Sequence, residues 1–137
     1  MTISEYIVGF LNEYEELKID TNRINDGYDR NGLFKSPSRN VSEKLDGSME
    51  ITEFYQFMAR QTAISDAERK ESDQWLEDLT YWIDDFKLQY QYPPIDGNRQ
   101  VMGIVITGSP APLSDADDEI IYQMSLAITY LREREDI

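Results

Sequence analysis

Apolar residues recur at three- and four-residue spacings over the first 17 positions, which is the pattern of an amphipathic helix. Thr2 or Ser4 can cap its N-terminus, because a hydroxyl there accepts a hydrogen bond from an N–H of the first turn. The opposite face is acidic, whereas helices that bind anionic membranes carry basic residues there. We therefore expect the helix to pack on its own domain. Its apolar positions are Ile3, Tyr6, Ile7, Phe10, Leu11, Tyr14 and Leu17.

The next segment predicts a short strand over residues 18–24 and a long loop over residues 25–40. Glycine, proline, asparagine, aspartate and serine are frequent in the second part, and these residues favour turns. Asp26 and Asp29 suggest a calcium loop, but the spacing does not fit the pattern of such loops. Loops of this length often bind partners or mediate assembly.

A hairpin is predicted around Asp46-Gly47, a pair favoured in two-residue type I′ turns. The strand after it alternates, so that one face is clearly apolar. Phe54 and Met58 make the second face partly apolar as well. The positions on the first face are Met49, Ile51, Tyr55, Phe57 and Ala59.

A second helix begins at a capping box formed by Ser65 and Glu68. Residues 66–74 contain one apolar residue, so these turns should face solvent or a partner. We expect Trp82 to anchor the helix against the sheet face that holds Tyr55, rather than to stack on a ligand. The apolar stripe consists of Trp75, Leu76, Leu79, Trp82, Ile83 and Phe86.

The C-terminal part predicts two strands. A short alternating run, 88–92, follows the helix, and a turn at Asp96-Gly97 leads into a β-branched strand over 99–107. An acidic loop is expected over 108–118. The segment Glu119–Arg132 fits both a helical stripe and strand alternation, and the alternation has more matches. The charged tail, 132–137, should fray.

This order of elements predicts one domain, residues 1–137, of the α+β class. Two helices should cover one face of a mostly antiparallel sheet, with long connecting loops.

Composition narrows the function. Among 137 residues there are 27 acidic and 13 basic side chains, so the net charge is −14, and neither cysteine nor histidine occurs. Such a charge disfavours binding to nucleic-acid phosphates or anionic membranes. Without histidine and cysteine, thiol catalysis, a Ser-His-Asp triad and thiolate metal sites are excluded. No catalytic motif is present, so we expect no enzyme activity, no catalytic residue, no cofactor and no metal.

Several short motifs resemble the tail-terminator (minor capsid) proteins of long-tailed phages and prophages of Gram-positive bacteria. That family has a Y-x-D-G hairpin before an aromatic strand, as in LDG…EFYQFMAR, although Lys44 stands here in place of the aromatic residue. The helix WLEDLTYWIDD is similar to the family's L-x-x-I-x-x-W-I helix. The strands VMGIVITGSPAPL and YQMSLAITYLRE, with the turn before them, match the remaining pieces.

The resemblance implies a non-enzymatic subunit of the phage tail. Such subunits form a hexameric ring that caps the tail tube and docks to the head–tail connector, in the virion and, during assembly, in the host cytoplasm. The strands at 18–24 and 119–132 are the candidate sheet edges for self-association. The candidate self-association residues are Tyr28, Leu33, Phe34, Leu113 and Tyr122.

Two other functions remain open. The acidity also suits an immunity or DNA-mimic protein that inhibits a basic nucleic-acid-binding enzyme, with carboxylates replacing phosphates. A hydrolase using a carboxylate pair is least favoured, because only generic acidic residues support it.

Overall fold

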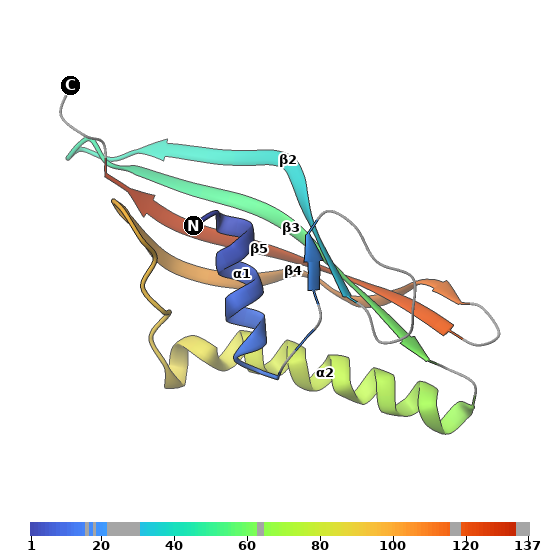
Figure 1. The fold of residues 1–137 in the computed structure, drawn as a ribbon. Coiled ribbons are helices and arrows are strands. Elements are labelled where there is room, and N and C mark those ends of the chain that lie inside the picture. Colours follow the sequence, from blue (N-terminus) through green and yellow to red (C-terminus); the bar gives the residue numbers. More distant parts are fainter. Residues whose placement is uncertain (16, 18, 22–30, 63–64, 116–118, 134–137) are drawn as a thin grey trace.

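A computed structural model describes residues 1–15, 17, 19–21, 31–62, 65–115 and 119–133, and Figure 1 shows its arrangement. A layer of long strands carries both helices on one face. The elements in chain order are α1 (Ile3–Asn12), β1 (Ile19–Thr21), β2 (Asn31–Glu43), β3 (Met49–Thr62), α2 (Asp66–Gln89), β4 (Arg99–Asp115) and β5 (Glu119–Arg132).

The strand order in the sheet is β1-β2-β3-β5-β4. β1 pairs with β2 in parallel, and every other neighbouring pair is antiparallel. The predicted α+β class and the mostly antiparallel sheet are therefore confirmed.

The helix starts follow from local capping. The Thr2 side chain accepts a hydrogen bond from the N–H of Glu5, and the Ser65 side chain accepts one from the N–H of Glu68. α2 continues to Gln89, so residues 88 and 89 of the expected alternating run belong to the helix. That part of the prediction was wrong, because helical backbone hydrogen bonds continue as far as the bond from the N–H of Tyr90 to the carbonyl of Phe86.

Much of the two expected loops is strand. Residues 31–40 belong to β2 and residues 108–115 belong to β4, while residues 25–30 and 116–118 lie outside the described part of the chain. Pairing with β3 and β5 outweighs the turn-forming composition. The irregular residues remain visible as register shifts, between Lys35 and Arg39 around Pro37 and along β4 around its prolines.

β5 is an interior strand, not an edge. It forms a full ladder with β3 on one side and a ladder with β4 on the other. Its alternation predicted the strand correctly, and the buried side chains follow that parity from Ile120 to Tyr130. The expectation that residues 119–132 form an edge for self-association was wrong.

The β2–β3 hairpin is present but closes through a longer loop than predicted. The N–H of Gly47 donates to the carbonyl of Lys44 (3.0 Å), and the N–H of Lys44 donates to the carbonyl of Ser48 (2.8 Å). Gly47 has φ of +89°, a conformation that glycine adopts without a steric penalty. The loop therefore consists of Leu45, Asp46 and Gly47, which places Leu45 at the tip.

The helices are joined to each other by aromatic rings. Trp82 lies 5.0 Å from Phe10, 5.4 Å from Tyr14 and 5.3 Å from Phe86, measured between ring centroids. Trp82 is thus half-buried between α1 and α2, and it packs against the core that contains Tyr55, as expected for an anchor of the helix. The neighbouring Leu79 and Ile83 are fully buried in that core.

Candidate functional site

The five candidate self-association residues are not brought together. Leu33 is completely buried in β2, and Tyr122 is 4% exposed in β5, so both are core residues and the prediction for them was wrong. Phe34 is half-buried and, by alternation with Leu33, lies on the sheet face away from the helices. Leu113 is 56% exposed on β4. Tyr28 lies outside the described residues.

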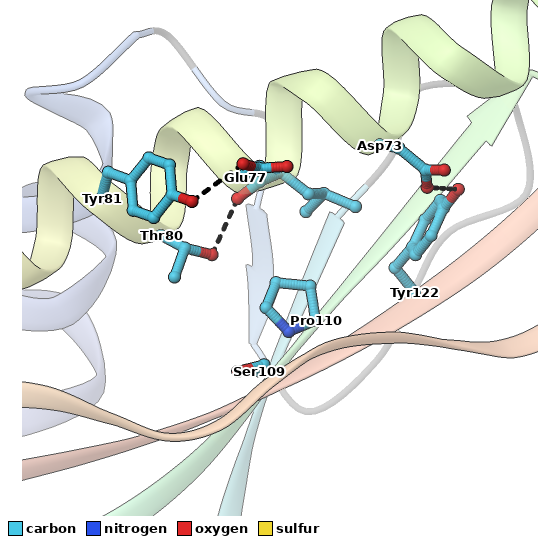
Figure 2. A pocket seen from close by; sticks show the side chains of 8 residues that line it. Asp73, Glu77, Thr80, Tyr81, Ser109, Pro110 and Tyr122 are labelled. Carbon is cyan, nitrogen blue, oxygen red and sulfur yellow. Dashed lines mark hydrogen bonds between the residues drawn. The ribbon is translucent and has the colours of Figure 1, made fainter.

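One groove runs between α2 and β4 and holds about 380 Å³ (Figure 2). Two acidic side chains of α2 line it, one helical turn apart, and a tyrosine hydroxyl donates to each. Tyr122 donates to Asp73 (2.6 Å), and Tyr81 donates to Glu77 (2.8 Å). The bond to Glu77, together with its charge, raises the pKa of Tyr81 above its usual value.

This groove is suited to weak attraction of a cationic group, because carboxylates lie beside phenol rings. Both carboxylates already accept strong hydrogen bonds, so neither is set up as a general base. Within residues that the structure describes, no three or more Asp, Glu, His or Cys side chains form a group that could hold a metal ion. No helix in that same part of the chain is long and apolar enough to cross a membrane.

A buried carboxylate lies elsewhere, in the middle of the sheet. Glu53 of β3 accepts a hydrogen bond from the hydroxyl of Tyr130 (3.0 Å) and forms an ion pair with Lys35 (3.3 Å). Burial first, and then the bond to Glu53, raise the pKa of Tyr130 to about 12. The cluster ties β2, β3 and β5 together and is structural in character.

The sheet has two open edges. β1 pairs only with residues 31–33, so in the described chain no strand pairs with the outer side of β2 beyond Leu33. On the other edge, no described strand pairs with the outer side of β4. The hydroxyl of Tyr92 blocks one position there, since it accepts from the N–H of Ile104 (3.2 Å) and donates to its carbonyl (3.4 Å).

A second groove, of about 680 Å³, follows the open edge of β4. Residues 99–102 form one wall and residues 90–95 the other. Exposed apolar side chains, Tyr90 and Met102, flank it. Sequence reasoning missed this groove, because only the strand order identifies β4 as an edge, and no local signal indicates that order.

Charge is distributed unevenly over the two edges. α2, which packs mainly along β4, carries eight acidic and three basic side chains, a net charge of −5. β2 carries two basic side chains and one acidic, and Lys44 follows at the hairpin turn. Asp46 in the same turn and the ion pairs of Lys35 with Glu53 and of Lys44 with Glu50 offset these basic side chains, so α2 is strongly acidic and the β2 edge is close to neutral.

No model of a known protein family matches the chain, and no curated protein matches it.

Proposed function

We propose that this protein is a non-enzymatic structural subunit that assembles into a closed ring, and that it serves as a tail terminator of a long-tailed phage or prophage. In that role the ring caps the tail tube, stops its growth and offers a docking surface to the head–tail connector. The protein would then reside in the virion tail, and in the host cytoplasm during assembly.

The observation that carries the proposal is the pair of open edges on opposite sides of one sheet. An unpaired edge presents free N–H and C=O groups that a second chain can use. Two different edges on one domain permit head-to-tail contact, the kind of contact that closes rings. The short motifs that resemble those of the tail-terminator family, spread over nearly the whole chain, support the same proposal.

The net charge of −14 suits a ring through which DNA passes, because an acidic lumen repels phosphates and does not hold them. The same charge opposes assembly, since the subunits repel one another. At physiological ionic strength, salt largely screens the repulsion between charges that lie more than about 8 Å apart. It screens charges buried in an interface much less. Assembly should therefore increase with salt.

Sedimentation velocity over a series of salt and protein concentrations tests the proposal, with electron microscopy of the largest species. We expect monomers in dilute protein at low salt. A hexameric ring should form as the salt or the protein concentration rises, or when tail tubes are added as a template. A protein that stays monomeric throughout, and forms a tight complex with a basic nuclease, would overturn the proposal and support the inhibitor alternative.

A further inference from the structure

We propose that the end of the β2–β3 hairpin of one copy binds in the groove along β4 of the next copy, which makes the sheet continuous between subunits. This inference rests on the proposed self-assembly and names its interface. The open part of β2 and the groove lie at the same end of the sheet, because Glu43 and Arg99 belong to one row of paired residues, Glu43–Met49–Arg132–Arg99.

The direction of the backbone groups of β2 follows from the hairpin turn. Lys44 and Ser48 form a hydrogen-bonded pair across the two strands. In an antiparallel ladder, such hydrogen-bonded pairs alternate with pairs of a second kind, in which the N–H and C=O groups of each residue point away from the partner strand. Val41 and Ile51 form the third pair before Lys44–Ser48, so theirs is a pair of the second kind. The N–H and C=O of Val41 therefore point outward, and no described residue hydrogen-bonds to them.

The edge of β4 presents the matching groups. The N–H of Glu133 donates to the carbonyl of Asn98 (2.9 Å), so that pair is hydrogen-bonded, and the backbone groups of Arg99 and then Val101 point outward. Val101 belongs to the same row as Val41, through Ile51 and Tyr130. Both ends of this row thus offer a donor and an acceptor at the same level of the sheet.

Strand direction also matches. Three antiparallel steps separate β2 from β4, so the two strands run in opposite directions. If subunits repeat side by side, β2 of one copy meets β4 of the next as an antiparallel pair, with Val41 opposite Val101 and Ser42 opposite Gln100. This pairing also brings Glu43 opposite Arg99, two side chains of opposite charge.

The structure limits how far the pairing extends. Tyr92 occupies the outward groups of Ile104, and further along β4 the register shifts and the prolines at 110 and 112 disfavour a regular ladder. At the corresponding end of β2, β1 covers residues 31–33. Only the hairpin end is left for a regular contact, so the contact is short and specific in register.

Apolar side chains favour the same contact. Leu45 is 110% exposed at the hairpin tip, and Val41, four residues before it, is 45% exposed. The groove offers Met102, itself 50% exposed and next to Val101, together with proline and tyrosine side chains. The charge of Lys44 does not add to the contact, because Glu43 and Asp46 flank Lys44 and Lys44 already pairs with Glu50 (3.6 Å). A second copy of the chain thus supplies apolar side chains that the groove can bury.

Engineered disulfides test the pairing, since the natural chain has no cysteine. In the proposed contact Ser42→Cys and Gln100→Cys form a non-hydrogen-bonded pair with Cα atoms about 4.5 Å apart, which suits a disulfide. Within one copy these positions are separated by three strand spacings, about 14 Å, too far for a bond. Oxidation of the double variant under assembly conditions should therefore give a ladder of covalent oligomers that ends at the ring size.

Two controls make this result specific. In the first control, Ser42→Cys is combined with Leu113→Cys, which lies on β4 like Gln100 but at the other end of that strand. This double variant should give no ladder of covalent oligomers. An equal mixture of the two single variants, Ser42→Cys and Gln100→Cys, should stop at dimers. A dimer formed by one single variant alone would indicate a two-fold contact between identical edges and would overturn the proposal.

The hairpin tip is tested by Leu45→Ser, with Leu88→Ser as the matched control. Leu88 is 76% exposed on α2 and does not line the groove. Loss of one buried leucine should raise the protein concentration for half assembly about tenfold or more, and the control should leave it unchanged. If the natural chain forms a ring but neither this variant nor the disulfides behave as expected, the interface is wrong. If the natural chain never assembles, the proposed function fails with it.

Discussion

Replacement of Tyr130 by phenylalanine should destabilise the protein far more than the same replacement at Tyr81. Each hydroxyl donates to a glutamate, at 3.0 Å to Glu53 and at 2.8 Å to Glu77. Tyr130 and Glu53 are each 6% exposed, whereas Tyr81 is 54% exposed. The two bonds are alike in chemistry and differ in their access to water.

The expected magnitude follows from that difference. A hydrogen bond to a charged group contributes about 1.5–3 kcal/mol, and loss of the donor leaves the Glu53 carboxylate without its buried partner. Lys35 still pairs with Glu53, but its side chain is half exposed, so that ion pair adds only about 0–1 kcal/mol. We expect Tyr130→Phe to cost about 2 kcal/mol, or roughly 4–8 °C in melting temperature for a domain of this size. Water replaces the lost partner of Glu77, so Tyr81→Phe should cost less than about 0.5 kcal/mol.

Urea denaturation at pH 7, followed by tryptophan fluorescence, measures both free energies of unfolding. A double-mutant cycle separates the charge from the contact. In a Glu53→Gln background the amide oxygen still accepts a bond, so Tyr130→Phe should cost only about 1 kcal/mol there. Equal costs at Tyr130 and Tyr81, or strict additivity in the cycle, would refute this reasoning.

Other expected outcomes concern the core, pH, the turn and metals. Trp82→Ala should lower the free energy of unfolding by about 3 kcal/mol or more, because it removes three aromatic contacts, with Phe10 of α1, with Tyr14 just after α1 and with Phe86 of α2; a near-neutral result in a urea titration would contradict that packing. The pKa values of Tyr6 and Tyr130 are raised to about 12 from the ordinary 10.0, chiefly by burial, so their contribution to stability is complete below pH 10 and is lost as pH rises to about 12. Between pH 10 and pH 12, the free energy of unfolding of Tyr6→Phe and of Tyr130→Phe should fall less steeply than that of the natural chain. Gly47→Val should cost about 1–2 kcal/mol by thermal melting, entirely from its positive φ, since nothing lies within 4 Å of the added Cβ; a neutral result would mean that the turn relaxes. A strong chelator should leave the melting temperature unchanged, and a large drop would reveal a structural cation.

The sequence by itself was sufficient for the elements whose signals are local. The apolar spacing of α1 and the hydroxyl caps predicted the helix starts, with Ser65 for α2 and Thr2 or Ser4 for α1, of which the structure uses Thr2. Caps and helical periodicity involve residues within one turn, so their signals are local. The alternation from Ile120 to Tyr130 identified β5 with the correct bounds, because an interior strand buries one complete parity of side chains. The α+β class followed from the order of these elements.

The tertiary structure alone decided which strands pair and which edges stay open. Residues 31–40 and 108–115 have the composition of loops, yet they are strands, because partners far away in the sequence satisfy their backbone groups. The alternation places Glu53 on the buried face of β3, between Ile51 and Tyr55, but its two partners come from other strands and were not evident from the sequence. The match between Val41 and Val101 depends on the register of three successive ladders. Strand pairing is non-local, and a shift of one residue in any ladder would reverse the direction of every backbone group at the edge, so the interface exists only in the folded sheet.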